Sequence, residues 1–313
     1  MRKILFTIIL LMFINFISRA QNPNGLVNWI SIEQADSLYN KQPKPMLIDF
    51  YTDWCGWCKH MMVTTYSNPT IAAYINENFY PVKFNAESTD TIIFRGDTLK
   101  NMGGGGRRPP HELAVQMLNG KLSYPSTVFF HDNQKLFFTV PGYLNTQRIE
   151  PILVFVVENV YKNASYQTFE KYYNMMRYDS IPRDTASIKW MSMEQAEALN
   201  KTKNAKPILL NIHTAWCNSC KTMNATTLTQ RALAQYINEK FYPVLLDAQS
   251  NDTIQFMGNT FTKKPGAFFH DFALAATQNS ITLPEIIIFS EQNTVINRIP
   301  QYLTPSQAEM ILK

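Results

Sequence analysis

Short apolar runs, each followed by a segment compatible with a helix, recur along this chain of 313 residues. Residues 45–51 form one such run and residues 207–212 form another, and each run begins with a proline. Runs of this length, bounded by a proline, are typical of buried strands. The residues that follow, 59–65 and 221–227, contain no glycine or proline, so we expect a helix after each strand.

The apolar pattern occurs twice because the sequence itself is repeated. The motif WISIEQA at Trp29 returns as WMSMEQA at Trp190, and residues 74–82 return at 236–244 with a single change. Matching residues lie between 159 and 162 positions apart, so the two copies differ only by small changes in loop length. Such self-similarity indicates a tandem duplication of one domain.

Each copy predicts the same order of elements. A helix that starts at a serine cap precedes the buried strand, and a helix that begins at the first cysteine of a pair follows it. The other elements are expected at residues 31–38, 68–78, 80–85, 126–131 with 136–140, and about 146–162 in the first copy, and at 192–200, 229–240, 242–247, 285–290 with 294–299, and from 304 onward in the second. This order of helices and strands, with a hairpin near its end, predicts an α/β fold with a mixed central sheet and helices on both faces.

The N-terminus has the pattern of a secretory signal peptide. Arg2 and Lys3 precede an apolar stretch that ends at Ile17, and small residues stand at the −3 and −1 positions of a cleavage site after Ala20. A membrane anchor is the alternative, but the stretch is shorter than the roughly 20 residues that span a bilayer. We therefore expect removal of residues 1–20, no stable membrane insertion afterwards, and a periplasmic or secreted location in which disulfides persist.

Charge and motif content argue against nucleic-acid and phosphate ligands. The chain has 29 basic and 24 acidic residues, three of the basic ones lie in the signal segment, and there is no long basic run, so nucleic-acid binding is not expected. An insertion in the first copy contains four glycines followed by two arginines and two prolines, residues 103–110. No Lys-Ser or Lys-Thr follows, so a surface loop is favoured over a phosphate-binding loop. His111 and His270, which come next in each copy, are interpreted as helix caps or buried histidines rather than proton-transfer groups.

Four cysteines are all that the chain contains, and they form two Cys-x-x-Cys motifs, Cys55 with Cys58 and Cys217 with Cys220. A thiol at a helix N-terminus faces unpaired N–H groups and the positive end of the helix dipole, which favours the thiolate. The second cysteine, one turn later, can attack a mixed disulfide formed by the first. This placement is a known signature of redox motifs. Structural disulfides, or half of a zinc or copper site, are the alternatives; two distant pairs would have to converge on one metal, so we expect none.

Residues 46–59 resemble the active-site strand and helix of the thioredoxin family. The resemblance covers residues 27–162 and 188–313, joined by a linker with a helical piece at 163–187. It implies two tandem thioredoxin-like folds, similar to secreted bacterial proteins with an enlarged loop before the proline strand. It also implies that the redox-active disulfides Cys55–Cys58 and Cys217–Cys220 take the place of a cofactor, with Cys55 as the nucleophile and Cys58 as the resolving thiol.

The same resemblance assigns supporting roles in the first copy. Asp49 stands where thioredoxins keep a buried carboxylate that exchanges a proton with the resolving cysteine, and Lys83 stands where they place a lysine near that carboxylate. Tyr124 and Pro125 match the pair that contains the cis-proline facing the disulfide. A cis-proline leaves the backbone of the residue before it free to pair with a substrate strand.

Tryptophans and the second copy complete the set of expected site residues. Trp54 and Trp57 are interpreted as an apolar collar that faces the substrate, whereas Trp29 and Trp190 are expected in the core. Leu283 and Pro284 take the positions of Tyr124 and Pro125 in the second copy. There, Asn211 replaces the carboxylate and Leu245 replaces the lysine, so we expect slower resolution by Cys220, with some help from His213 conceivable.

The sequence thus favours a thiol–disulfide oxidoreductase that acts on protein thiols or disulfides and depends on an upstream redox partner, either membrane-bound or soluble. The first copy is expected to be catalytically complete and the second to be weaker or auxiliary. The alternative is a non-catalytic binding or scaffold protein whose disulfides are purely structural. A third possibility is an electron relay between the two copies.

Overall fold

The computed structural model describes residues 25–103, 107–131, 136–179 and 184–313. The expected signal peptide, residues 1–20, and three glycines of the loop at 103–110 lie outside the described residues. The chain divides into two compact units, Met1–Arg148 and Ile149–Lys313, here called unit 1 and unit 2. The expected boundary at residues 162–163 stays a prediction, whereas most of the first copy's closing helix groups with unit 2.

Unit 1 contains a four-stranded mixed sheet in the order β2-β1-β5-β6. Strand β1 pairs in parallel with β2 and antiparallel with β5, and β5 forms an antiparallel hairpin with β6. The strands are β1 (Met46–Tyr51), β2 (Tyr80–Asn85), β5 (Ser126–His131) and β6 (Leu136–Pro141). Central strand β1 carries the apolar run predicted from the sequence, and it leads directly into the cysteine motif.

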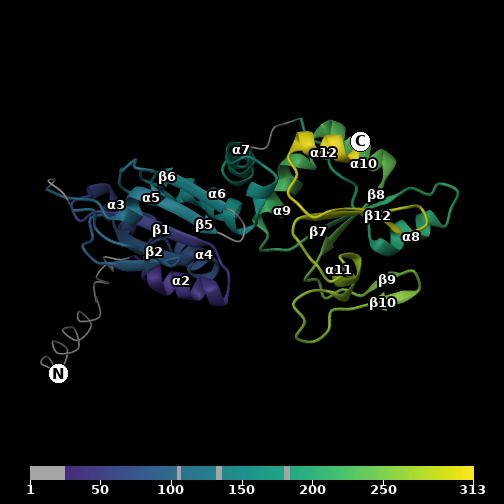
Figure 1. Ribbon diagram of the computed structural model, residues 1–313. Helices are drawn as coiled ribbons and strands as arrows, with labels where there is room; N and C mark the ends of the chain where they lie inside the picture. The colour runs from purple at the N-terminus through teal and green to yellow at the C-terminus, as the bar shows by residue number, and fades with distance from the viewer. Residues whose placement is uncertain (1–24, 104–106, 132–135, 180–183) are drawn as a thin grey trace, which may run out of the picture. The chain divides into compact units, whose positions relative to one another are not determined.

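The helices of unit 1 lie on both faces of this sheet (Figure 1). They are α2 (Ile32–Lys41), α3 (Gly56–Thr64), α4 (Pro69–Asn78) and α5 (Glu112–Met117). Ser31 caps α2 with its side chain, and Gln34 returns the bond to the Ser31 N–H, which is the reciprocal capping box expected from the sequence. The side chain of Asn68 caps α4 by accepting the N–H groups of Thr70 and Ile71, without a reciprocal bond, and Pro69 occupies the first turn.

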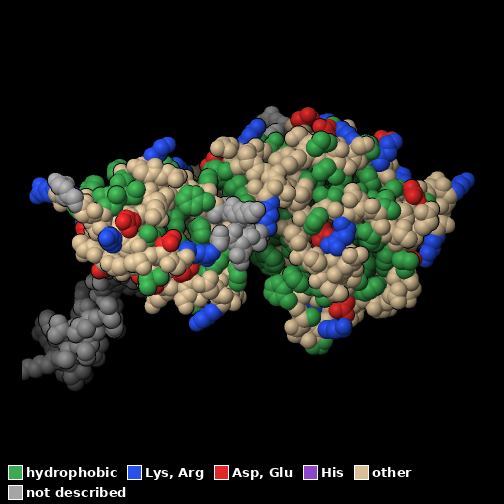
Figure 2. Space-filling view, in the orientation of Figure 1, with side chains coloured by type: hydrophobic (Ala, Val, Ile, Leu, Met, Phe, Trp, Pro, Cys, Tyr) green, Lys and Arg blue, Asp and Glu red, His purple; other side chains and the backbone are tan. Residues whose placement is uncertain are grey.

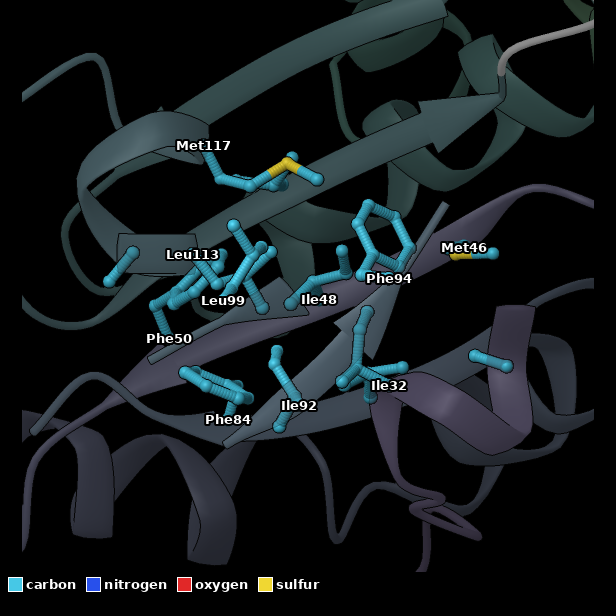
Figure 3. Packing of buried hydrophobic residues seen from close by; sticks show 14 of the residues in the cluster. Ile32, Met46, Ile48, Phe50, Phe84, Ile92, Phe94, Leu99, Leu113 and Met117 are labelled. Atoms are coloured by element: carbon cyan, nitrogen blue, oxygen red, sulfur yellow. The ribbon is translucent and has the colours of Figure 1, made fainter. Parts of the chain in front are cut away.

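The core of unit 1 shows which way the residues of β1 point. Met46, Ile48 and Phe50 belong to one buried cluster with Ile32 of α2 and Leu113 of α5 (Figure 3). Side chains alternate between the two faces of a strand, so Asp49 points to the opposite face, where α3 lies. The strand therefore places one carboxylate beneath the helix that carries the cysteines.

Unit 2 repeats this architecture with the sheet order β12-β11-β7-β8. Its sheet consists of β7 (Ile208–His213), β8 (Tyr242–Asp247), β11 (Glu285–Phe289) and β12 (Val295–Ile299). Its helices are α8 (Met193–Asn200), α9 (Asn218–Thr222), α10 (Arg231–Lys240), α11 (Asp271–Ala276) and α12 (Pro305–Leu312). Three further elements come before them in the chain: α6 (Thr146–Val157), a short 3₁₀ turn η3 (Val160–Lys162) and α7 (Tyr166–Arg177). The first three residues of α6 belong to unit 1. The α/β class with a mixed four-stranded sheet in each copy, as predicted, is confirmed.

Helix α9 differs from its counterpart α3. It continues as a π-helical turn, η4 (Met223–Thr227), whereas α3 is regular throughout. The hydroxyl of Thr226 donates to the carbonyl of Thr222 at 2.6 Å, a bond that competes with the regular helix ladder. Single π turns often mark functional positions in helices.

Two short hairpins were not anticipated from the sequence. Strands β3 (Ile92–Phe94) and β4 (Asp97–Leu99) pair in unit 1, and β9 (Ile254–Phe256) and β10 (Asn259–Phe261) pair in unit 2. Their turns place Arg95 and Met257 at positive φ, each followed by a glycine. Arginine and methionine rarely adopt this conformation. These turns therefore lack the Asn-Gly or Asp-Gly dipeptide by which a hairpin is usually recognised in a sequence.

The expectation for two tryptophans was wrong. Trp29 and Trp190 are only partly buried. Trp29 instead packs its ring edge-on against fully buried Tyr66, with centroids 4.8 Å apart. On the visible face of each unit, basic and acidic side chains are interspersed rather than collected in one field (Figure 2). Within the described residues, no helix is long and apolar enough to cross a membrane.

Candidate functional site

Cys55 and Cys58 form a disulfide at the start of α3. Cys55 is the N-cap of the helix, and its sulfur accepts the N–H of Cys58 at 3.1 Å. Strand β1 ends at Tyr51, residues 53 and 54 form a turn, and the helix begins at Gly56, directly after its cap. The N-terminal N–H groups of α3 therefore face the sulfur of Cys55, which favours a thiolate when the disulfide is reduced.

Asp49 is fully buried beneath this helix. Burial raises the pKa of the Asp49 carboxyl to about 7, although nearby Lys83 and the Tyr66 hydroxyl act in the opposite direction. Oδ1 accepts a hydrogen bond from the Tyr66 hydroxyl at 3.4 Å, and Oδ2 has no partner within the described residues. A carboxyl with a pKa near neutrality and one open oxygen is suited to accept and return a proton.

A cavity of about 420 Å³ joins the resolving cysteine to the lysine. Cys58 and Lys59 border it from α3, Lys83 borders it from β2, and Tyr51 borders it from the end of β1. Lys83 pairs with Asp49 in the register of the sheet, and its ammonium lies 4.7 Å from the ring centre of Tyr51. Burial lowers the pKa of Lys83, while Asp49 raises it. The cavity gives water a place beside Cys58 and Lys83, near the buried carboxyl.

Exposed aromatic residues surround the disulfide at the surface. Trp54 and Trp57 are 53% and 62% exposed, in contrast to the buried cysteines between and beside them. The peptide bond between Tyr124 and Pro125 is cis, and the Trp54 and Tyr124 rings lie 6.3 Å apart. The Trp54 indole N–H donates to Glu87 at 2.9 Å, which fixes the ring's orientation. These side chains form an open, apolar border suited to a protein substrate.

A groove of about 310 Å³ runs from Trp57 to the cis-proline. Tyr143 lines it and contacts the rings of both Trp57 and His60, with centroid distances of 5.4 and 5.2 Å. Arg148 lines it as well and donates to the carbonyl of Tyr143 at 2.8 Å. Unit 1 therefore presents its disulfide beside a shallow cleft with aromatic walls and one guanidinium.

Cys217 and Cys220 form the second disulfide, again with the first sulfur capping the helix. The carboxylate and lysine of unit 1 have no equivalents here: Asn211 donates to Asn224 at 2.8 Å, and Leu245 faces the surface. Burial lowers the pKa of half-buried His213, which lines a cavity of about 530 Å³ that neither cysteine borders. The structure thus gives no support to a proton-transfer role for His213.

The surroundings of the second disulfide are also different. The Leu283–Pro284 bond is cis, and Trp216 is 48% exposed beside Phe268, so exposed aromatic rings also lie next to this disulfide. On the other side of the helix, however, the carboxylate of Glu158 accepts the N–H groups of Asn218 at 3.0 Å and Ser219 at 2.7 Å. One of its oxygens lies 3.7 Å from the sulfur of Cys217. Burial raises the pKa of Glu158, and the hydrogen bonds from Ser219 and Asn218 and the charge of Lys221 lower it.

The two histidines that follow the insertions have structural roles. Nδ1 of His111 accepts the N–H of Leu113 at 3.1 Å, so Nε2 carries the proton and donates to the carbonyl of Asp90 at 3.0 Å. His270 makes the equivalent bonds to Phe272 and Asp252. Both side chains are fully buried helix caps, as interpreted from the sequence. No cluster of three or more metal-ligating side chains occurs among the residues that the structure describes.

Sequence reasoning missed two residues of these sites. Tyr66 lies 17 residues from Asp49 along the chain, and Glu158 lies 59 residues from Cys217. Both contacts are tertiary, so no local spacing could have revealed them. A signal for the second was nevertheless present: the position of Trp57 is taken by a small serine in the second motif, which leaves room for another segment.

Comparisons with known proteins agree with the repeated fold. A model described as a thioredoxin-like domain matches residues 32–156, and a second thioredoxin-like model matches residues 189–273. The first match includes most of α6, although α6 groups with unit 2 in the structure. No match was found among curated proteins.

Solved structures with a similar fold include single and tandem domains. DsbH oxidoreductase is 19% identical over 40% of this chain and 79% of its own, with a TM-score of 0.29. A thioredoxin-fold protein from Helicobacter pylori is 19% identical over 49% of this chain and 94% of its own, with a TM-score of 0.34. The first two thioredoxin domains of Saccharomyces cerevisiae Eps1p are 10% identical over 93% and 98% of the two chains, with a TM-score of 0.29. At these identities and scores, neither substrate nor partner carries over to this chain.

Proposed function

Because the chain is a tandem thioredoxin-like protein, we propose that unit 1 is a thiol–disulfide oxidoreductase that acts on protein thiols or disulfides. The observation that carries this proposal is the position of the Cys55–Cys58 disulfide. It lies at a helix N-terminus, above a buried carboxyl with a pKa of about 7 and beside an exposed aromatic cleft. A purely structural disulfide needs neither the carboxyl nor the cleft.

The exchange proceeds in two displacements. In the reducing direction, the Cys55 thiolate attacks one sulfur of a substrate disulfide, a mixed disulfide forms, and the other substrate sulfur leaves as a thiolate. Cys58 then loses its proton to Asp49, through water in the adjoining cavity, and attacks the sulfur of Cys55. The second substrate sulfur leaves, and Cys55–Cys58 is left oxidised. Two electrons pass to the substrate; in the oxidising direction each step is reversed.

The cleft accounts for binding of a protein rather than a small thiol. Trp57, Tyr124 and Tyr143 offer aromatic surface against which an extended segment of a protein can lie. Turnover requires that an upstream redox partner, membrane-bound or soluble, restores the starting state of Cys55–Cys58. The N-terminal pattern supports a periplasmic or secreted site of action, and sequencing the N-terminus of the exported protein tests cleavage after Ala20.

The direct test is insulin reduction with dithiothreitol as the electron donor. Cys55→Ser should abolish activity above the uncatalysed rate, whereas Cys217→Ser should retain most of it. Equal activity of Cys55→Ser and the parent protein would end the proposal for unit 1.

Unit 2 supports a second candidate function, that of a binding or scaffold domain. Its disulfide lacks a carboxyl in the position of Asp49, and Glu158 occupies the start of the cysteine helix. Separate measurement of the two reduction potentials distinguishes the cases. A potential below about −300 mV for Cys217–Cys220 indicates a structural disulfide, and a higher value indicates an exchangeable one.

A further inference from the structure

One face of the cysteine helix is open in unit 1 and covered in unit 2. Trp57, His60 and Thr64 are all exposed along α3. The equivalent positions in the second copy, Ser219, Thr222 and Thr226, are at most 1% exposed. The spacing of three and four residues places each set on a single helix face. Where the helix is covered, small hydroxyl residues therefore stand in place of Trp57 and His60, and the threonine at the third position is unchanged.

The cover is the segment that precedes the second domain. Helix α7 packs against α9 and η4, and Figure 1 shows α7 beside α9. Phe169 of α7 meets the ring of Tyr302 edge-on at 5.3 Å, and both residues are buried. Tyr302 is the counterpart of Tyr143, which lines the open groove of unit 1. The segment thus occupies the region of unit 2 that corresponds to the proposed substrate cleft of unit 1.

Glu158 lies at the end of α6, where this cover reaches the disulfide. Its carboxylate accepts hydrogen bonds from the N–H groups of Asn218 and Ser219. At an open helix terminus these N–H groups would face the sulfur or its substrate. Its charge lies 3.7 Å from the Cys217 sulfur, where an attacking thiolate would bring a second negative charge. At this distance two like charges repel strongly in a partly desolvated environment.

We propose that Glu158 closes the second disulfide to anionic thiols and so determines that exchange with outside proteins takes place at Cys55–Cys58. The proposal rests on the exchange function assigned above to unit 1. Glu158 acts here as a specificity-determining residue, and the rest of the α6–α7 segment holds it in place. No part of this role requires Glu158 to react.

The reaction that Glu158 hinders is ordinary disulfide reduction. An external thiolate attacks the Cys217 sulfur, the bond to Cys220 breaks, and Cys220 leaves as a thiolate that takes up a proton from water. A second molecule of the external thiol then attacks the mixed disulfide. The products are reduced Cys217 and Cys220 and one oxidised disulfide of the external thiol, so two electrons enter unit 2.

The test uses the full chain with Cys55→Ser and Cys58→Ser, so that only the second pair can be reduced. Two small thiols of opposite charge serve as probes, cysteamine as the cation and 2-mercaptoethanesulfonate as the anion, with rates normalised to thiolate concentration. Reduction is followed by alkylation and mass spectrometry. With Glu158 present, we expect the cationic thiol to react at least about tenfold faster than the anionic one.

Glu158→Gln keeps the size of the side chain and removes its charge. We expect the anionic thiol to react about tenfold faster with this variant, and the ratio of the two probes to fall toward one. Glu170→Gln is the matched control, because Glu170 lies on α7 and accepts from Tyr166 without contacting a cysteine. This control should keep the parent ratio.

A loosened fold would accelerate both probes equally, so the ratio separates a charge effect from misfolding. Glu158→Asp, which keeps the charge on a shorter side chain, should retain a preference for the cationic probe. An unchanged ratio in Glu158→Gln would overturn the proposal. That result would leave the function of unit 1 intact, since the insulin assay with Cys55→Ser tests it separately.

Discussion

The phenolic oxygen of Tyr66 lies 3.4 Å from Oδ1 of Asp49, and both side chains are fully buried. The bond is long, but among the described residues it is the one hydrogen bond that this carboxyl accepts, and the low local dielectric strengthens it. In the second copy, Asn211 and Leu228 stand at the equivalent positions. The carboxyl and its phenol are therefore both absent from the unit whose cysteine helix is covered.

Replacing the carboxyl should slow the second displacement. In Asp49→Asn, Cys58 has no buried base, so we expect the mixed disulfide with substrate to resolve about 10²-fold more slowly at pH 7. Rapid-quench alkylation should show this mixed disulfide accumulating. Asp97→Asn, which removes an exposed carboxylate of β4 that does not border the cavity, should resolve at the parent rate. A parent rate in Asp49→Asn would mean that water alone suffices as the base.

The same residue should make stability depend on pH. The pKa of Asp49 is raised from 3.8 to about 7, so the folded protein binds its proton more tightly than the unfolded chain does. The stabilisation is complete below pH 4 and is lost as the pH rises through 7, up to roughly 4 kcal/mol in the unfolding free energy of unit 1. Asp49→Asn should lack this loss. Urea unfolding of the oxidised protein at pH 4 and pH 9 measures it, and parallel pH profiles for the parent and variant proteins would contradict the assignment.

Removing the phenol should shift the pH at which exchange is half-maximal. The Tyr66 hydroxyl lowers the pKa of Asp49 by donating to the carboxylate. In Tyr66→Phe we therefore expect the midpoint to rise by about 0.5 to 1 pH unit, within the range of a hydrogen bond to a charged group. Tyr143→Phe also removes a phenol, but one that meets Thr64 at the surface, and it should leave the midpoint in place. A change in rate with an unchanged midpoint would assign Tyr66 a packing role only.

Truncating the aromatic wall should affect protein substrates selectively. Trp57→Ala removes a largely exposed ring from the groove, so we expect KM for insulin to rise about tenfold. The rate with a small disulfide such as oxidised glutathione should change less than twofold, because it does not need the groove. Trp216→Ala removes the exposed tryptophan of unit 2 and should leave both measurements unchanged. Equal losses with both substrates would indicate damage to the disulfide itself.

The sequence predicts the elements that local patterns determine. Strands β2 and β8 begin and end where expected, because each follows closely on the polar end of a helix, at Asn78 or Lys240, and finishes on a polar residue, Asn85 or Asp247. The caps at Ser31 and Ser192 were likewise predictable, since a capping box needs only residues three positions apart.

The rest of the site depends on contacts between distant parts of the chain. Glu158 reads as an ordinary carboxylate near a helix end until folding brings it to Ser219, 61 residues away. The grouping of α6 with unit 2 could not be predicted either, because apolar periodicity shows that a helix has a buried face but not which core receives it. Only the small side chains at Ser219 and Thr222 hinted at the covered face.

A tethered occupant is difficult to displace. The segment over Ser219 and Thr222 belongs to the same polypeptide, so it remains near its docking face at an effective concentration of roughly millimolar order. A free competitor would have to exceed that concentration or bind far more tightly. Gene duplication has in this way produced two related helix faces, of which one is covered by the chain's own segment and the other is exposed.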